Sequence, residues 1–135
     1  MFDQNINILL VDDMKTMRAL VKKTCMNLGF KNFTEAVDGK DAWEKLTTPG
    51  SKFDLVLSDW NMPNLQGIEL LKKVRAEEST KNIPFLLITA ENEAGQVQEA
   101  IVAGVDNYLI KPFSANDLKS RLEAIYKKRY GSNAA

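Results

Sequence analysis

Short apolar runs alternate with segments of helical spacing along the chain, and this alternation limits the folds that the chain can adopt. The strands expected from this pattern lie at 6–11, 31–36, 53–58, 85–89 and 106–110, and the one at 31–36 is shorter and weaker, so we place it at the edge of the sheet. Near-continuous apolar runs of this length favour parallel strands that are covered on both faces. Strict alternation of strands and helices predicts a parallel sheet with right-handed crossovers and helices on both sides. We therefore expect an α/β fold, a doubly wound parallel sheet of five strands with five helices.

Residues that commonly begin or end helices delimit the helical segments. Gly29 is suited to end the helix expected over 14–28, because glycine readily takes the C-cap conformation. Asp38 and Ser114 each precede a helical segment and each has an aspartate three positions further on, which predicts an N-cap at both. Two more helices are expected over 67–78 and 93–103.

Apolar stripes indicate which side of a helix should face the sheet. The stripe of the first helix comprises Met17, Leu20, Val21, Thr24 and Leu28. Cys25 lies on the same stripe, so we expect a buried and unreactive thiol. In the fourth helix the residues expected to face inward are Ala94, Val97 and Ile101. In the last helix they are Leu118, Leu122, Ile125 and Tyr126.

The composition excludes several classes of function. A length of 135 residues predicts a single domain over 1–135 without a separate output domain. Eighteen basic and eighteen acidic residues leave no net charge, which argues against a nucleic-acid partner. The sequence has no histidine, which excludes a Ser-His-Asp triad, the usual zinc site and a phosphohistidine on this chain.

The sequence also indicates a cellular compartment. A single cysteine cannot form an internal disulfide and fits a reducing environment. Residues 1–7 lack a basic flank, and the apolar run that follows them is too short for a signal peptide or a membrane span. We therefore expect a cytoplasmic protein without membrane contact.

Polar side chains follow the predicted strands at the points where the strands end. The run at 53–58 is followed by Asp59, and the first run is followed by Asp12 and Asp13. The loops after the carboxyl ends of parallel strands form the ligand crevice of such sheets. If the first and third strands are neighbours, the three carboxylates converge. At least one of them should then have a raised pKa unless a cation is bound.

The residue types at these strand ends suit phosphoryl chemistry. Mg²⁺ prefers a few carboxylates together with waters and accepts phosphate as a ligand. Lys111 supplies a positive charge and Thr89 a hydroxyl, and both can bind phosphoryl oxygens. A carboxylate beside Mg²⁺ and a lysine can itself be the nucleophile and form an aspartyl phosphate. The strand ends therefore predict a magnesium-dependent phosphoryl site.

Five stretches that together span nearly the whole chain form a specific combination of motifs. They are ILLVDDMKTMR (8–18), EAVDGKDAWEKL (35–46), DLVLSDWNMPNLQGIELLKKVR (54–75), FLLITAE (85–91) and GVDNYLIKPF (104–113). In these stretches the chain resembles the receiver domain of response regulators, and most closely the single-domain chemotaxis members of that family. The resemblance implies a flavodoxin-like fold with strand order 2-1-3-4-5. It also implies a cis peptide bond between Lys111 and Pro112.

The resemblance further implies a role for each polar residue at the strand ends. Asp59 would accept the phosphoryl group from a histidine kinase. Asp13 and Asp59 would bind Mg²⁺ directly, and Asp12 would act largely through water. The main-chain carbonyl of Asn61 would complete the protein ligands. The contacts to the phosphoryl group would come from Thr89 and Lys111.

A conformational switch is part of what the resemblance implies. Phosphorylation would draw Thr89 inward, and Tyr108 would turn from an exposed to a buried position. The face formed by the fourth helix, the last strand and the fifth helix would then change its affinity for a partner, with the flagellar motor switch as the expected one. Asn61 and Glu91 match positions that set how fast the phosphoryl group is lost, so we expect short-lived phosphorylation. A phosphatase partner and a monomeric state are also expected.

The sequence leaves two other functions open. The same fold could serve as a phosphate sink or relay carrier without a motor partner. A Mg²⁺-dependent phosphatase with an aspartate nucleophile, similar to the haloacid dehalogenases, is a more distant alternative. Those enzymes place D-x-D-x-T after their first strand and need a larger core, whereas here the first strand is followed by Asp12-Asp13-Met14-Lys15. We therefore expect a signalling protein that catalyses only its own phosphorylation and dephosphorylation.

Overall fold

A computed structural model of the chain describes residues 1–90 and 94–131. Its strands form one parallel sheet in the order β2-β1-β3-β4-β5. The strands are β1 (Asn7–Val11), β2 (Asn32–Ala36), β3 (Leu55–Asp59), β4 (Phe85–Thr89) and β5 (Asn107–Ile110). The helices are α1 (Lys15–Asn27), α2 (Gly39–Leu46), α3 (Gly67–Ala76), α4 (Ala94–Ala103) and α5 (Ala115–Tyr130). The predicted alternation, the parallel sheet and the strand order are therefore confirmed.

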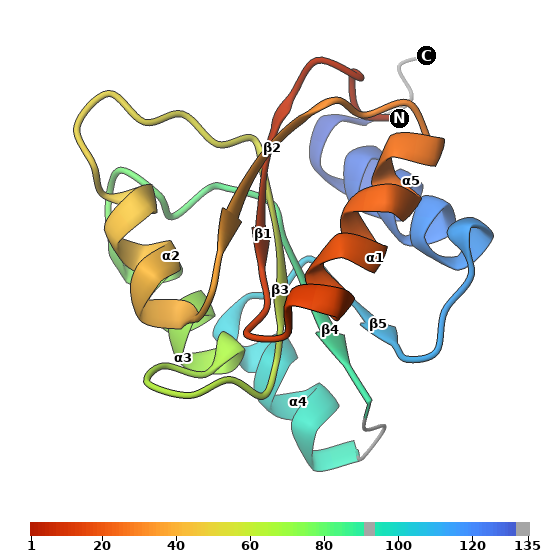
Figure 1. Cartoon of the computed structure of the whole chain (residues 1–135). Helices are drawn as coiled ribbons and strands as arrows, with labels where there is room; N and C mark the ends of the chain where they lie inside the picture. Colours follow the sequence, from red (N-terminus) through yellow and green to blue (C-terminus); the bar gives the residue numbers. More distant parts are fainter. Residues whose placement is uncertain (91–93, 132–135) are drawn as a thin grey trace.

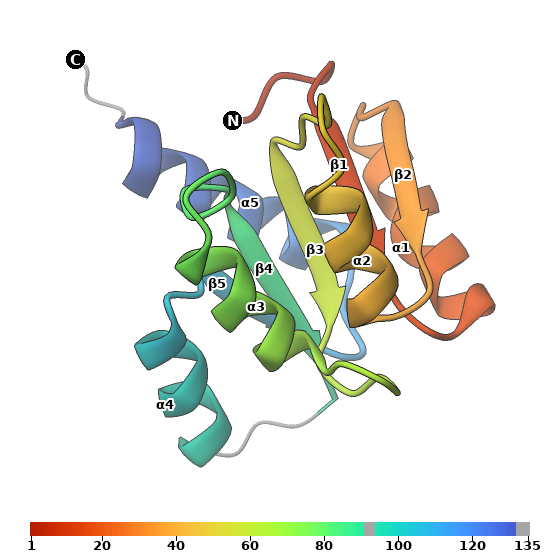
Figure 2. The same ribbon diagram turned by 90° about the vertical axis from the view of Figure 1, so that its left-hand side faces the viewer.

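Helices cover both faces of the sheet (Figure 1). Two of them, α1 and α5, lie on one side, and α2, α3 and α4 lie on the other (Figure 2). Each side has its own core of buried side chains. Leu9 and Leu10 are neighbours in β1 and belong to different cores, because successive strand side chains point to opposite faces. Val56 and Leu57 of β3 divide between the two cores in the same way.

The pairing register brings the carboxyl ends of the strands to one edge of the sheet. Val11 of β1 pairs with Ser58, the residue before Asp59. Thr89, the last residue of β4, pairs with Ile110 of β5. Residues that follow β1 and β5 therefore emerge at the same edge as the ends of β3 and β4. This edge is where the sequence predicts the functional site.

The predicted helix caps are present. At the start of α2, the amide of Asp41 donates to the Asp38 carboxylate at 2.7 Å. At the start of α5, the amide of Asp117 donates to the Ser114 hydroxyl at 3.1 Å, and the Ser114 amide donates to the Asp117 carboxylate at 2.9 Å. Gly29 follows α1 with a φ of 104°, in the left-handed region that favours glycine. Within 1–90 and 94–131, none of the helices combines the length and apolar character that crossing a membrane requires.

Two helices are rotated differently from the sequence expectation. The expectation that Ile101 of α4 faces inward is wrong, because Ile101 is 58% exposed whereas Ala100 is buried. In α1, Leu20 is 51% exposed, while Val21 and Cys25 are buried. Both helices carry apolar residues on more than one side, so packing against the sheet decides which side is covered.

The other residues that we expect to face the sheet are buried or half-buried wherever the structure describes their side chains. In α5 the residues Leu118, Leu122 and Ile125 are buried and Tyr126 is half-buried. In α4 Val97 is half-buried, and the side chain of Ala94 lies outside the described part of the structure. Burial raises the pKa of the Cys25 thiol to about 12, which fits the unreactive thiol that we expect.

Candidate functional site

Three acidic side chains gather at the carboxyl edge of the sheet. Asp12 and Asp13 follow β1, and Asp59 ends β3. One carboxylate oxygen from each lies within 4.8 Å of the other two. Asp12 and Asp59 are 5% and 8% exposed, whereas Asp13 is exposed to solvent. The predicted convergence of the three acids is confirmed.

Asp12 is the acid whose titration is most affected by its surroundings. Burial raises the pKa of the Asp12 carboxyl above its ordinary value, and the nearby charge of Asp59 acts in the same direction. The amide of Met14 donates to Asp12 Oδ1 at 2.9 Å and opposes this change, because it stabilises the ionised carboxylate. The raised pKa that the sequence predicts for one member of the cluster is therefore found at Asp12.

Lys111 brings a positive charge to the cluster. Its Nζ lies 2.9 Å from Asp59 Oδ1, and the two side chains are 18% and 10% exposed. The amide of Lys111 donates to the Thr89 carbonyl at 2.8 Å, which fixes the loop after β5 to the end of β4. The bond between Lys111 and Pro112 is cis, as the family resemblance implies. Thr89 is 4% exposed, so a buried hydroxyl-bearing side chain completes this edge.

The donor set fits a hard divalent cation. Carboxylate oxygens are the ligands that Mg²⁺ prefers in proteins, and here three carboxylates can each offer one to a common point. Lys111 offsets only one of the three negative charges. Burial is the main cause of the raised pKa of Asp12, and the negative charges of Asp59 and Asp13 add to it.

The loop after β3 is tied to the start of α2. Asn64 donates from Nδ2 to Asp38 Oδ2 at 2.6 Å, and the amide of Gly39 donates to the Leu65 carbonyl at 3.2 Å. Asn61 is exposed within this loop, on the same edge of the sheet as the acids. Its expected role as a metal ligand remains a prediction. Glu91, the other residue expected to tune dephosphorylation, lies outside the described residues.

The expected switch residue, Tyr108, is half-buried on β5. The guanidinium carbon of Arg121, on α5, lies 5.4 Å from the centre of its ring. Arg121 also donates from Nη1 to Asn107 Oδ1 at 3.2 Å, and the Tyr108 amide donates to the same oxygen at 2.9 Å. Sequence analysis missed Arg121, because nothing local distinguishes it from a solvated arginine on a helix.

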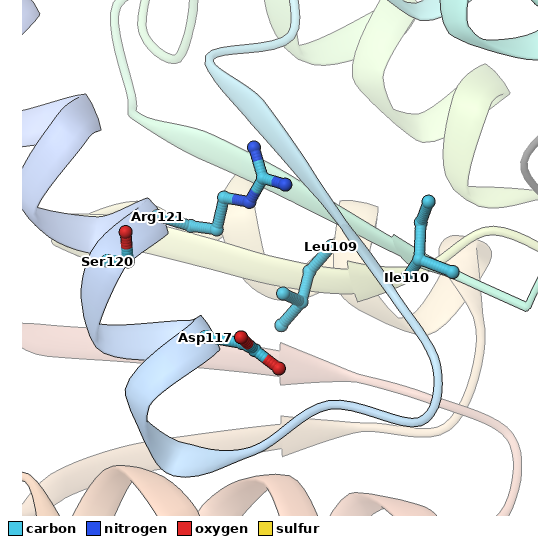
Figure 3. A pocket seen from close by; sticks show the side chains of 5 residues that line it. All are labelled: Leu109, Ile110, Asp117, Ser120 and Arg121. Carbon is cyan, nitrogen blue, oxygen red and sulfur yellow. The ribbon is translucent and has the colours of Figure 1, made fainter.

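Two hollows border β5. In Figure 3 the side chains of Leu109 and Ile110 lie across from three side chains of α5; the α5 residues are Asp117, Ser120 and Arg121. A larger groove of about 580 Å³ runs between α4, β5 and α5. Its lining comprises Ile101, Gly104, Val105, Asp106, Asn107, Tyr108, Ala124 and Lys128. Ile101 and its neighbour Val102 are 58% and 77% exposed, and exposed apolar side chains beside a groove favour contact with another protein.

Comparison with known proteins gives consistent results. The family profile of the response regulator receiver domain matches residues 8–123. Chemotaxis protein CheY-3 of Vibrio cholerae serotype O1 is 48% identical over 126 residues, which are 93% of this chain and 95% of that protein. The crystal structure of chemotaxis protein CheY4 of Vibrio cholerae is similar with a TM-score of 0.81 and 32% identity, over 90% of this chain and 98% of that one.

A further solved structure bears on the metal. It is the receiver domain of a sensor histidine kinase from Pseudomonas aeruginosa PAO1 with a magnesium ion coordinated in the active site cleft. It is similar to this chain with a TM-score of 0.78 and 27% identity, over 95% of this chain and 99% of that one.

The sheet order, the acids at its carboxyl edge and these similarities agree with one another. The chain therefore belongs to the response regulator receiver domain family, as a CheY-like domain of two-component signalling.

Proposed function

We propose that this chain is a stand-alone receiver whose Asp59 accepts a phosphoryl group from a histidine kinase in the presence of Mg²⁺. The observation that supports this most strongly is the convergence of three carboxylates within 4.8 Å. A lysine lies 2.9 Å from Asp59, the member of this group that ends the central strand. The magnesium ion in the related receiver from Pseudomonas aeruginosa supports the same assignment.

In this proposal Asp59 would act as the nucleophile. One carboxylate oxygen would attack the phosphorus of a donor phosphohistidine. The P–N bond breaks, and its electron pair returns to the donor imidazole. The ammonium group of Lys111, which now pairs with the Asp59 carboxylate, would pair with the phosphoryl oxygens instead. The Thr89 hydroxyl would donate a hydrogen bond to one of these oxygens. Bound Mg²⁺ would neutralise charge on the transferring group.

The burial of the acids supports a division of roles between them. Asp13 is exposed and can meet a hydrated ion, so it would bind Mg²⁺ directly together with Asp59 and the Asn61 carbonyl. Asp12 is buried, and one of its oxygens already accepts the Met14 amide. This arrangement supports the expectation that Asp12 acts largely through water.

The output would be a change at the groove between α4, β5 and α5. Phosphorylation would draw Thr89 toward the phosphoryl group, and Tyr108 would turn inward from its half-buried position. Tyr108 would then have an outward and an inward conformation. A partner that binds only one of these conformations would shift the equilibrium between them. We propose the flagellar motor switch as this partner, and the similarity to chemotaxis protein CheY-3 supports that choice.

Further parts of the proposal concern the state of the protein in the cell. We propose that the chain acts as a monomer in the cytoplasm, as a single receiver domain over 1–135. The free thiol of Cys25 fits that compartment. Asn61 and Glu91 would make the phosphorylation short-lived, and a phosphatase could shorten it further.

Intact mass after incubation with acetyl phosphate and Mg²⁺ tests the site. The wild-type chain should gain one phosphoryl group that hydroxylamine removes, because aspartyl phosphates are acyl phosphates. Asp59→Asn should gain none, and a metal chelator should prevent labelling of the wild type. Equal labelling of Asp59→Asn, or an unlabelled wild type, would contradict the proposal.

The other functions give different results. Binding of a motor switch protein to the phosphorylated form alone supports the motor partner. Equal binding to both forms, or none, favours a phosphate sink or relay carrier. Repeated turnover of many phosphate esters would favour the phosphatase.

A further inference from the structure

Arg18 connects the acid cluster to the edge strand of the sheet. Its Nη1 donates to the main-chain carbonyl of Asp12 at 2.8 Å, and its Nε donates to Glu35 Oε1 at 2.7 Å. Glu35 belongs to β2, and the Arg18 side chain is only 12% exposed. Charge-assisted bonds of this length from a rigid, buried guanidinium fix their partners more strongly than neutral bonds do.

The residue that Arg18 holds is one of the three site acids. The amide of Asp12 donates to the Ala36 carbonyl at 3.1 Å, and its carboxylate accepts the Met14 amide at 2.9 Å. The bond from Arg18 adds a third restraint, on the carbonyl that precedes Asp13. The direction in which the Asp13 side chain leaves the backbone therefore depends on this bond.

Arg18 also lies close to the site itself. Asp12, Arg18 and Asp59 all line the same small cavity of about 10 Å³. A positive charge here could repel a metal ion. Glu35 pairs with Arg18 at 2.7 Å, however, and the hydrogen bond from Arg18 lowers the pKa of Glu35, so that Glu35 stays ionised and balances the charge. The positioning effect should therefore outweigh the repulsion.

We infer that Arg18 is a positioning residue for metal binding, which fixes the turn carrying Asp12 and Asp13 by linking it to Glu35. This inference rests on the proposed function, because it concerns the affinity of the same site for Mg²⁺. Groups that orient metal ligands from outside the coordination sphere typically change metal affinity by about 10–100-fold when removed.

Calorimetric titration with Mg²⁺ tests the inference on Arg18→Ala, with Lys22→Ala as the matched control. Lys22 Nζ lies 3.4 Å from the same Glu35 carboxylate and, unlike Arg18, does not hydrogen-bond to Asp12. Arg18→Ala should raise the Kd for Mg²⁺ about tenfold, at the lower end of that range. Lys22→Ala should leave the Kd within about twofold, because an exposed ion pair contributes little.

A second measurement needs no metal. Hydrogen exchange at the hydrogen-bonded amides of Asp12 and Met14 should become faster in Arg18→Ala and stay unchanged in Lys22→Ala. A merely structural role would lower the melting temperature without changing either the Kd or this local exchange. If Arg18→Ala does not fold, Arg18→Lys replaces it. Its Kd for Mg²⁺ should lie between the wild-type value and the roughly tenfold higher value expected for Arg18→Ala, because one ammonium group replaces two directed N–H donors.

The outcomes separate the inference from the proposed function. If the wild type binds Mg²⁺ and a folded Arg18 variant binds it equally well or more tightly, the inference is overturned and the proposed function stands. If the wild type binds no Mg²⁺, the proposed function fails, and faster local exchange in the variant would then show only that Arg18 orders the turn.

Discussion

At the scale of single residues, the ion pair between Lys111 and Asp59 sets the charge balance of the site. Lys111 Nζ lies 2.9 Å from Asp59 Oδ1, and both side chains are mostly buried. The same lysine would have two opposing effects. It would compete with a metal ion for Asp59, and it would stabilise the additional negative charge that arrives with a phosphoryl group.

Replacing Lys111 by methionine should separate these effects. Lys111→Met keeps most of the length of the side chain and removes its charge, so the Kd for Mg²⁺ should fall. The rate of labelling by acetyl phosphate should fall about 100-fold, as is typical when one preorganised donor is lost. Calorimetry and timed intact-mass measurements give the two values. Weaker Mg²⁺ binding together with slower labelling would show that Lys111 mainly maintains structure.

The contribution of Glu35 to the stability of the fold should depend on pH. The hydrogen bond from Arg18 is the main cause that lowers the pKa of Glu35 below its ordinary value of 4.5. The ion pair therefore stabilises the fold above pH 4.5, and the contribution is lost as the pH falls through the lowered pKa. Because Glu35 is 37% exposed, we expect at most about 1 kcal/mol.

Urea unfolding of wild type and Glu35→Gln measures this contribution. The wild type should be more stable at about pH 7, and the difference should shrink at acidic pH as Glu35 becomes protonated. A difference that is the same at both pH values would mean that packing, and not charge, is responsible.

The connection between β3 and α3 shows how tightly an element boundary can fix a functional residue. The amide of Gly67 donates to the Trp60 carbonyl at 2.8 Å. A Cβ added at Gly67 would lie 2.1 Å from the carbonyl oxygen of Asp59. The start of α3 therefore leaves room only for glycine, and any shift there would move the backbone of Asp59.

Two glycine substitutions should have effects of opposite sign. Gly67→Ala should lower the free energy of unfolding by about 1–3 kcal/mol, as overpacking usually does, and should weaken Mg²⁺ binding. Gly95→Ala, in α4, is the control, because nothing lies within 4 Å of an added Cβ. It should stabilise the chain by up to about 1 kcal/mol through helix propensity. Urea unfolding measures both, and a neutral Gly67→Ala would mean that the loop can relax without cost.

Across the whole molecule, a strong polar network lies at the end of the sheet opposite the acids. Asp106 precedes β5 and accepts hydrogen bonds from Arg75 at 2.8 Å and from the Phe85 amide at 2.7 Å. Arg129 of α5 pairs with the same carboxylate, which is 9% exposed. This network joins α3, β4, β5 and α5 at the amino ends of the strands.

Removing the central carboxylate should therefore affect stability and leave the chemistry unchanged. Asp106→Ala leaves two arginines without their carboxylate partner, and we expect a loss of about 3 kcal/mol, typical of a broken buried pair. The Kd for Mg²⁺ should stay within about twofold, because positions without shared partners are usually independent. Urea unfolding and calorimetry test this. A large change in the Kd would show coupling between the two ends of the sheet.

The sequence by itself determined the features that depend on local signals. Apolar runs predicted most of the strands, and the residue types at positions 38 and 114 predicted the helix caps. The approach of Asp12 and Asp59 could be predicted as well, because parallel strands bring their carboxyl ends to one edge. The family motifs added the strand order and the cis bond after Lys111.

Only the tertiary structure decided which side of α1 and of α4 is covered and which distant side chains meet. It left Ile101 exposed on α4, and it placed Arg18 between Asp12 and Glu35. It also gathered three elements around Asp106. Such contacts join residues far apart in the chain, and they follow from how helices rotate and pack on the sheet. Periodicity within a single segment does not determine these contacts between segments.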